Sequence, residues 1–288
     1  MVPELGKYCF SRLAIIANTI QTVVLPNGEI IKTRQRSRKS SAGFDTTKLF
    51  IGAEGTLGII TEGMFSPSFS LALLITFSIA TIRLTPLLPT NVAVVQFPSV
   101  KHATEAVVEV MNKGVGIQCV ELVDEVFMKA TNKLGMSKRK WPEKDSLFFK
   151  LQGPTPASLA ESGKIVQEVV KKYGGSNFQL ARNEVEAEEL WSDRKNAHFA
   201  GLALYPGATG WPTDVCVPVS KLPELVMGTQ KDLQERGLVS SVIGHVGDGN
   251  FHAMILFKTE EEKRLAKEAV ALMVDRAIAL EGTCTSSF

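Results

Sequence analysis

The stretch Gly244-His245-Val246-Gly247-Asp248-Gly249-Asn250-Phe251-His252 decides how the fold of this chain is interpreted. Asp-Gly is a favoured two-residue turn between antiparallel strands. A turn centred on Asp248-Gly249 places His245 directly opposite His252. Directly opposed residues share one face of a sheet, with Cβ atoms about 4.5–5.5 Å apart. The sequence therefore predicts a β-hairpin that carries two imidazoles side by side.

This histidine pair is a candidate metal site. Two imidazoles that lie so close can converge on one divalent ion at metal–nitrogen distances of about 2.0–2.1 Å. The alternative is two polar side chains on a solvated hairpin face. We favour the metal site, because the chain has only four histidines and two of them meet across one tight turn. Two nitrogen ligands do not complete a site, so we expect a third ligand from elsewhere, a carboxylate.

Outward from this hairpin, helical and strand patterns alternate from Pro89 to the end of the chain. In 99–113, apolar residues recur at a spacing of three or four residues, which indicates a helix with one buried face. Helices that alternate with largely antiparallel strands are typical of an α+β domain. No internal sequence repeat is visible. The expected strands are 92–97, 146–152, 213–217 and two that flank 246–251, the expected helices are 99–113, 121–134, 155–172, 184–204, 219–236 and 259–281, and 137–144 is expected to be a charged loop.

The part of the chain before Pro89 lacks this alternation of helical and strand patterns. We therefore place a domain boundary there and expect domains at 1–89 and 90–288. Pro26-Asn27-Gly28-Glu29 separates two segments rich in β-branched residues. Asn-Gly, like Asp-Gly, is a favoured two-residue turn. We therefore predict a second hairpin there.

The run Gly52-Ala53-Glu54-Gly55-Thr56-Leu57-Gly58 can bring its backbone close to a ligand, because glycine has no side chain. The run lacks the GxGxxG pattern and precedes a strand rather than a helix. Neither a Rossmann dinucleotide site nor a phosphate-binding P-loop is therefore supported. By physics alone, a plain turn is an equally good interpretation.

Composition excludes several classes of protein. The 32 basic and 30 acidic side chains leave a net charge of +2, which gives no basic footprint for nucleic acid. The four cysteines, Cys9, Cys119, Cys216 and Cys284, form no CxxC pair. A disulfide framework and a thiolate zinc site are therefore not expected, and a reducing compartment is the default. The first ten residues resemble neither a secretory signal nor a mitochondrial leader.

Residues 63–82 carry no charge over a length that could span a bilayer. Ser66-Pro67-Ser68 interrupts the start of this segment, and no Lys/Arg cluster flanks it. Deleting 63–80 would join Glu62 to Thr81 and create one continuous alternating strand. The codons for Gly63-Met64-Phe65 can also spell a common splice-donor sequence. We therefore expect 63–80 to be an insertion, namely translated intron, while a membrane-tethered protein remains the alternative.

A second candidate for chemistry is Arg194, in a segment expected to be helical. Its planar guanidinium is suited to a carboxylate ligand. By itself, this residue is better explained as a solvated arginine near Glu189 or Asp193. The same caution applies to His198 on that helix.

Several stretches together resemble one family, the FAD-binding oxidoreductase/transferase type 4 family in its D-lactate dehydrogenase (cytochrome) branch. The resemblance runs from about Thr22 to near the end of the chain, apart from 63–80. The stretches that carry it are KSSAGFDTTKLFIGAEGTLGIITE (39–62), TIRLTPLLPTNVAVVQFPS (81–99), LWSDRKNAHFAGLALYPG (190–207), TDVCVPVSKL (213–222), GHVGDGNFH (244–252) and EGTCT (281–285).

The resemblance implies an α+β fold, with the C-terminal part of a vanillyl-alcohol-oxidase-type FAD domain followed by a ferredoxin-like substrate cap. His245 and His252 match the metal ligands, for zinc or manganese. Arg194 matches the arginine that holds the substrate carboxylate, which reverses the interpretation above, and Asn250 is placed beside the substrate. Arg194 and the two histidines are the expected catalytic residues, and the expected FAD contacts are Ser40, Glu54, Gly55, Gly58, Ile60 and Thr61.

The implied reaction is oxidation of D-lactate to pyruvate by metal-assisted hydride transfer to FAD, with electrons passed to cytochrome c in the mitochondrion. The runner-up substrates are D-2-hydroxyglutarate and glycolate. A different alternative is a non-catalytic cap that binds only a metal. No nucleic-acid partner is expected, and membrane association is left open.

The chain departs from the family pattern at both ends. The family's pyrophosphate-binding glycine-rich segment is missing, and residues 1–20 do not match. In the family, EGTCT runs into Gly-Glu-His-Gly, which supplies the third metal ligand and the base, whereas here Ser286-Ser287-Phe288 follow. We therefore expect this 288-residue chain to bind FAD poorly and to have little activity.

Overall fold

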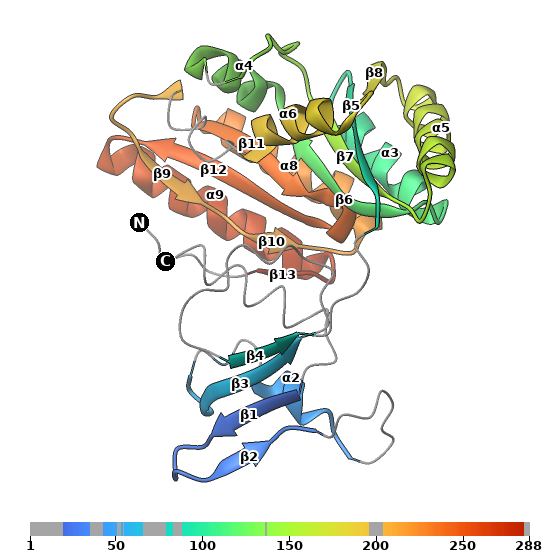
Figure 1. The fold of residues 1–288 in the computed structure, drawn as a ribbon. Helices are drawn as coiled ribbons and strands as arrows, with labels where there is room; N and C mark the ends of the chain where they lie inside the picture. Colours follow the sequence, from blue (N-terminus) through green and yellow to red (C-terminus); the bar gives the residue numbers. More distant parts are fainter. Residues whose placement is uncertain are drawn as a thin grey trace. The chain divides into compact units, whose positions relative to one another are not determined.

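The computed structural model describes residues 20–34, 43–50, 53, 55–65, 79–82, 88–135, 137–195 and 204–284 (Figure 1). It divides the chain into two compact units, Met1–Leu87 and Leu88–Phe288. Each unit has its own sheet, and each is described by itself below.

The smaller unit is a four-stranded sheet with the order β2-β1-β3-β4. Its interior is small: Val23 is fully buried, and Phe50 is almost so. A Cβ atom on Gly58 would lie 2.7 Å from Val23 Cγ1 and 2.9 Å from the Val24 oxygen, so close packing requires glycine there. The described elements are β1 (Ile20–Val24), β2 (Ile30–Lys32), α2 (Thr46–Phe50), β3 (Ile59–Phe65) and β4 (Ile79–Ile82).

Strands β1 and β2 form the predicted hairpin, but the predicted two-residue turn is wrong. Leu25 N donates to Glu29 O at 2.9 Å, and Gly28 N donates to Leu25 O at 2.8 Å, so three residues form the loop. Gly28 has a φ of +84°, whereas Asn27 is not among the residues with positive φ. A two-residue type I′ turn needs positive φ at both positions. The longer loop restricts this conformation to the glycine.

The uncharged segment 63–82 begins and ends in strands. Gly63 to Phe65 extend β3, and β4 pairs with this end of β3 in parallel. A continuous 20-residue membrane helix over this segment is therefore wrong. Among the residues described, no helix has the length and apolar character needed to cross a bilayer. The expected insertion stays a prediction, because residues 66–78 lie outside the described part of the chain.

The larger unit is a nine-stranded sheet in which every pairing is antiparallel. The order is β13-β10-β12-β11-β6-β7-β5-β8, and β9 pairs with β12. The strands are β5 (Thr90–Gln96), β6 (Ile117–Val123), β7 (Ser146–Gln152), β8 (Ser176–Leu180), β9 (Thr209–Pro212), β10 (Val215–Cys216), β11 (Val239–His245), β12 (Asn250–Phe257) and β13 (Thr283–Cys284).

This sheet contains the ferredoxin-like topology twice. In chain order, β5-α3-β6-β7-α5-β8 and β10-α8-β11-β12-α9-β13 both follow a strand–helix–strand–strand–helix–strand pattern, with α4 inserted between β6 and β7 of the first set. Within each set, the spatial order is fourth, first, third, second strand. The two sets join where their second strands, β6 and β11, pair. The helices are α3 (Val100–Asn112), α4 (Glu125–Leu134), α5 (Pro156–Lys172), α6 (Glu184–Lys195), α8 (Leu222–Glu235) and α9 (Glu260–Ala279).

The ferredoxin-like α+β cap that the sequence predicts is thus confirmed. The repeat is one of topology rather than of sequence, which explains why the sequence shows no internal similarity. The connection between the two halves carries α6 and β9, which are additions to the repeated pattern.

The two faces of the sheet are covered differently. Because side chains alternate along a strand, Val120 and Leu122 of β6 enter the main apolar core with α3, α5, α8 and α9. Val123 enters a second, smaller cluster with α4 and α6 on the other face. Figure 1 shows α4 and α6 together on that side of the sheet. This second face is the one that carries the histidine pair.

Four strands of the larger unit, β6, β8, β9 and β13, were not predicted. The predicted helix 121–134 begins only at Glu125, because Asp124 ends β6 and caps α4 through its side chain. The predicted helix 184–204 is described as helix to Lys195, and 196–203 lie outside the described residues. The helical spacing of the residues after Asp124 conceals the short strand before it.

Candidate functional site

The histidine hairpin exists, but its predicted register is wrong. His245 lies opposite Asn250, and His252 lies opposite Ile243. The chain turns through a 3-10 segment, Val246–Asp248, and Gly249 follows with a φ of +75°. The shift is two positions, and an even shift keeps every side chain on its predicted face. His245 and His252 are therefore on the same face, as diagonal rather than direct neighbours.

The two imidazoles are close enough to share a ligand. Their ring centroids lie 5.4 Å apart, with the ring planes at 87°. A tetrahedral ion about 2.0–2.1 Å from one nitrogen of each ring would hold the centroids about 5 Å apart. Both rings are partly open to solvent, with side-chain exposures of 29% for His245 and 24% for His252.

Each ring is held through its Nδ1 atom, which leaves Nε2 to face a ligand. His252 Nδ1 lies 2.9 Å from the Thr213 carbonyl oxygen, and His245 Nδ1 lies 2.8 Å from Glu121 Oε1. Metal-bound histidines usually donate their other ring N–H to such a carbonyl or carboxylate. Burial lowers the pKa of His252, although Asp214 and the Thr213 carbonyl oppose this effect. This donor set fits a divalent metal at two coordination positions.

Glu121 was not predicted from the sequence, and the structure places it at the centre of the cluster. Its two carboxylate oxygens contact different partners: Oε1 contacts His245, and Oε2 lies 2.7 Å from Arg194 Nη2. Burial raises the pKa of Glu121, but the hydrogen bonds and charges of His245 and Arg194 outweigh it and lower the pKa overall. The residue was missed because β6 was interpreted as the start of a helix. A single acidic residue in the apolar run Ile117–Val123 was the signal.

Arg194 lies on a helix, as predicted, and is the last but one residue of α6 as the structure describes it. It is brought to the histidines through Glu121. Its Nε atom is buried and has no hydrogen-bond partner among the residues described. A buried N–H group without an acceptor is costly, so an acceptor is expected there. A substrate carboxylate has the chemistry that this position lacks.

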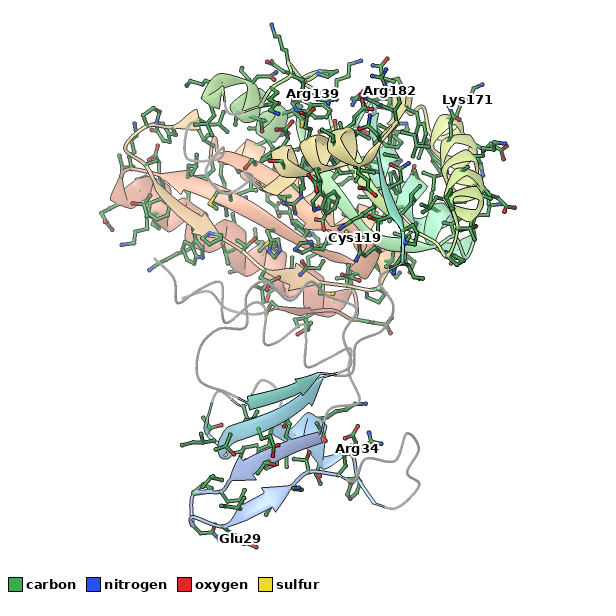
Figure 2. All side chains as sticks on the ribbon, in the orientation of Figure 1. Glu29, Arg34, Cys119, Arg139, Lys171 and Arg182 are labelled. Carbon is green, nitrogen blue, oxygen red and sulfur yellow. The ribbon has the colours of Figure 1, made fainter. Side chains whose placement is uncertain are left out.

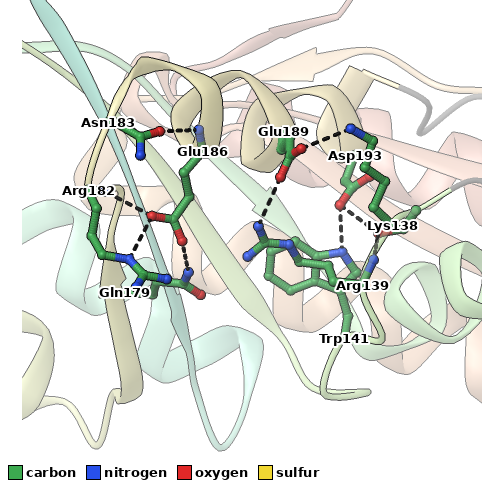
Figure 3. Close-up of polar contacts among 10 residues, drawn as sticks. Lys138, Arg139, Trp141, Gln179, Arg182, Asn183, Glu186, Glu189 and Asp193 are labelled. Atoms are coloured by element: carbon green, nitrogen blue, oxygen red, sulfur yellow. Dashed lines mark hydrogen bonds and ion pairs between the residues drawn. The ribbon is translucent and has the colours of Figure 1, made fainter.

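Polar contacts rather than an apolar face fix α6 (Figure 3). Only Leu190 of this helix is fully buried. Asp193 Oδ2 accepts hydrogen bonds from Trp141 Nε1 and Ser137 Oγ, both at 2.8 Å. Toward the other end, the helix contacts its surroundings through Glu186, with Gln179 and Arg182, and through Glu189, with Lys138 and Arg139. These contacts hold the helix that carries Arg194.

Asn250 lies opposite His245 in the sheet, but its amide nitrogen is already engaged. Asn250 Nδ2 donates to Asp214 Oδ1 at 2.7 Å and to the Val215 oxygen at 3.1 Å. Only its Oδ1 atom is left for another partner. The predicted contact of Asn250 with substrate stays a prediction.

Cys119 is close to the cluster but unsuited to its chemistry. It lies on β6, two residues before Glu121, and therefore on the same face (Figure 2). Burial raises the pKa of the Cys119 thiol to about 12. The thiol stays protonated near neutral pH, which disfavours it as a nucleophile.

The predicted third metal ligand has no counterpart in the described part of the chain. There, no group of three or more His, Cys, Asp and Glu residues is arranged to hold a metal. Glu121 does not fill this position, because both of its oxygens are engaged by His245 and Arg194.

The predicted FAD contacts lie in the smaller unit. Gly55 has a φ of +83° and open space around it, whereas Gly58 packs against its own sheet. Ile60 and Thr61 lie in β3, and Thr61 Oγ1 donates to the Thr22 oxygen at 3.3 Å. Ser40 and Glu54 lie outside the described residues, so the FAD contacts stay predictions.

Comparisons with known proteins give a family match and several relatives. Residues 89–287 match the family model of the FAD-linked oxidases, C-terminal domain. The mitochondrial D-lactate dehydrogenase [cytochrome] of Arabidopsis thaliana is 39% identical over 286 residues, which cover 96% of this chain and 47% of that protein. The glycolate oxidase subunit GlcD of Escherichia coli (strain K12) is 28% identical over 264 residues, covering 91% and 49%. The chain spans about half the length of the curated relatives that it matches.

Solved structures share the fold. An alkyldihydroxyacetonephosphate synthase superposes with a TM-score of 0.57 at 17% identity, covering 94% of this chain and 49% of that one. The 4-ethylphenol oxidase from Gulosibacter chungangensis superposes with a TM-score of 0.58 at 13% identity, covering 92% and 56%. With the family match, these similarities confirm the predicted vanillyl-alcohol-oxidase-type fold.

Proposed function

Since this chain belongs to the family of FAD-linked oxidases, whose C-terminal domain it contains, we propose that it acts in the flavin-dependent oxidation of D-lactate to pyruvate. Residues 1–89 would be part of the FAD domain, and 90–288 would be the substrate cap. Relatives named mitochondrial D-lactate dehydrogenase [cytochrome] support D-lactate as substrate, a cytochrome as acceptor and a mitochondrial location. Within this class of acceptor, we propose cytochrome c. No nucleic acid takes part.

One observation carries this proposal: Arg194, His245 and His252 gather on one face of the cap sheet, around Glu121. Arg194 would bind the carboxylate of a 2-hydroxy acid, because its guanidinium suits that group and its buried Nε lacks an acceptor among the described residues. His245 and His252 would hold zinc or manganese through Nε2. A bound metal would lower the pKa of the substrate 2-hydroxyl, and FAD would supply the hydride acceptor.

The proposed function is tested by comparing 2-hydroxy acids that differ in chirality or in length. The protein isolated from its own cells should show a flavin absorbance band that D-lactate bleaches and L-lactate does not, and D-lactate should reduce cytochrome c. Faster reduction with D-2-hydroxyglutarate or glycolate would contradict D-lactate as the substrate. A protein that carries metal but no flavin would contradict the oxidase assignment in favour of a metal-binding cap.

Removing either imidazole should abolish tight metal binding. We expect His245→Ala and His252→Ala each to weaken Zn²⁺ affinity by more than about 100-fold, because one imidazole alone cannot chelate. The measurement is a Zn²⁺ titration against a competing chelator dye. His102→Ala is the matched control, since His102 contacts Ser99 at the start of α3, away from the pair. Equal affinity in all three variants would place the metal elsewhere.

A further inference from the structure

Glu121 links the two halves of the cap at the proposed site. It lies on β6 of the first ferredoxin-like set, whereas His245 lies on β11 of the second, and Arg194 comes from the connection between them. The β6–β11 register pairs Val123 with Ile243 and Leu122 with Gly244. The next pair in this register is Glu121 with His245. Both side chains therefore lie on the face of the sheet that carries the histidine pair.

Stability alone gives no reason for a carboxylate at this position. The neighbouring residues Val120, Leu122 and Val123 are fully buried, and Glu121 itself is only 5% exposed. Burying a charge is costly, and replacing a buried ion pair by apolar groups of similar volume is often neutral or stabilising. Apolar side chains in place of both Glu121 and Arg194 would fill this space at no greater cost. The carboxylate therefore points to a role in arranging its partners.

Each oxygen of the Glu121 carboxylate contacts a different partner. Oε1 lies 2.8 Å from His245 Nδ1, and Oε2 lies 2.7 Å from Arg194 Nη2. A carboxylate only accepts hydrogen bonds, so His245 donates from Nδ1 and keeps the lone pair of Nε2 free. The same group fixes the plane of the Arg194 guanidinium.

We infer that Glu121 is a positioning residue that sets the tautomer of His245 and the orientation of Arg194 together. It couples the metal ligand to the group that binds the substrate carboxylate, without touching metal or substrate itself. The inference rests on the proposed function for the role of the metal and the substrate. The arrangement of His245 and Arg194 by Glu121 stands independently of which acid is oxidised.

Two variants separate this role from a purely structural one. Glu121→Gln keeps one acceptor oxygen, so it can serve His245 or Arg194 but not both. Glu121→Leu serves neither partner and removes the buried charge. Glu109→Gln is the matched control, because the Glu109 carboxylate also accepts two hydrogen bonds, from Lys172 and Tyr173, but in the region of α3 and α5.

The first readout is the ¹⁵N NMR spectrum of the histidine ring nitrogens in the metal-free chain. We expect His245 to be protonated at Nδ1 in the unaltered chain and in Glu109→Gln. In Glu121→Leu, we expect a mixture of the Nδ1–H and Nε2–H forms. This readout needs neither flavin nor substrate, so it remains informative if the proposed enzyme function is wrong.

The second readout is Zn²⁺ affinity measured with a competing dye. Loss of a partner that orients a metal-bound histidine typically weakens metal binding by about 10- to 100-fold. We expect Glu121→Leu to fall in this range and its midpoint of urea unfolding to decrease, because buried Arg194 loses its partner. Glu109→Gln should bind Zn²⁺ as before. A folded Glu121→Leu that keeps the Nδ1–H form and binds Zn²⁺ within threefold of the unaltered chain overturns the inference. If Glu121→Leu fails to fold, Glu121→Gln decides: because glutamine can serve only one of the two partners, an unchanged His245 tautomer together with an unchanged Arg194 ¹⁵Nε signal overturns the inference.

Failure of the enzyme proposal looks different from failure of this inference. A chain that binds no Zn²⁺, but in which His245 loses its fixed tautomer only when Glu121 is replaced, contradicts the metal-dependent oxidation and supports the positioning role. A chain that oxidises D-lactate unchanged in Glu121→Leu contradicts the positioning role and supports the enzyme.

Discussion

Replacing Gly249 by alanine should destabilise the larger unit by about 2–5 kcal/mol. Gly249 has a φ of +75°, a conformation that costs an L-residue about 1–2 kcal/mol. A Cβ atom there would also lie 1.9 Å from the Val217 carbonyl oxygen, which belongs to the backbone. The overlap cannot be relieved by rotating a side chain, and overpacking of this kind adds about 1–3 kcal/mol.

The overlap occurs where β10 meets the histidine hairpin. Val217 N donates to the Gly249 oxygen at 3.0 Å, and Cys216 Sγ contacts the Asp248 oxygen at 3.4 Å. Moving Val217 away would break the bond that seats the hairpin on β10. We therefore expect Gly249→Ala to weaken Zn²⁺ binding as well, because the turn fixes the distance between the two imidazoles.

Urea unfolding followed by tryptophan fluorescence measures the effect in this unit alone, since Trp141, Trp191 and Trp211 are the only tryptophans. Gly237→Ala is the matched control: Gly237 has a φ of +67°, and a Cβ atom added to it would have no other atom within 4 Å. Gly237→Ala should lower the free energy of unfolding only by the cost of the backbone conformation, about 1–2 kcal/mol. Equal losses for the two variants would show that the overlap with Val217 is relaxed at little cost.

Both glycine turns show what a local pattern can determine. Asn27-Gly28 and Asp248-Gly249 each predict a hairpin, and each hairpin is present. In both, the glycine has positive φ while the residue before it does not, so the loops contain three and four residues instead of two. The dipeptide indicates where the chain reverses. The loop length depends on the strands to which the turn is attached, and these lie elsewhere in the sequence.

The face of the histidines was predictable and their partner was not. Side-chain alternation fixes the face of a strand residue, and a shift of two positions preserves it. Glu121 meets His245 across 124 positions of sequence, and only the pairing of β6 with β11 brings them together. A local pattern carries no information on that pairing. Arg194 was identified through a resemblance, since its helix has no marked apolar face to predict its orientation.

Replacing Asp124 by alanine should cost about 2–5 kcal/mol near neutral pH. Asp124 is buried, and its side chain caps α4 by accepting a hydrogen bond from Phe127 N at 2.8 Å. Its other oxygen accepts from Val242 N at 2.7 Å, which connects α4 to β11. Alanine leaves two buried N–H groups without these acceptors, and each such group costs about 1–3 kcal/mol. Thr155→Ala removes an exposed cap of the same kind from α5 and should cost about 1 kcal/mol.

The loss caused by Asp124→Ala should also depend on pH. Burial raises the pKa of Asp124 to about 8, although the hydrogen bonds from Phe127 and Val242 oppose this effect. The folded chain therefore holds this proton more tightly than the unfolded chain, in which an aspartate has a pKa of about 3.9. The contribution of Asp124 is complete below that value and is lost as the pH rises through about 8. The difference in unfolding free energy between the unaltered chain and Asp124→Ala should thus shrink from pH 5 to pH 8.5, by at most about 1.4 kcal/mol per pH unit. The loss in Thr155→Ala should stay constant over this range, and a difference for Asp124→Ala that grows with pH would mean that Asp124 is ionised in the folded chain.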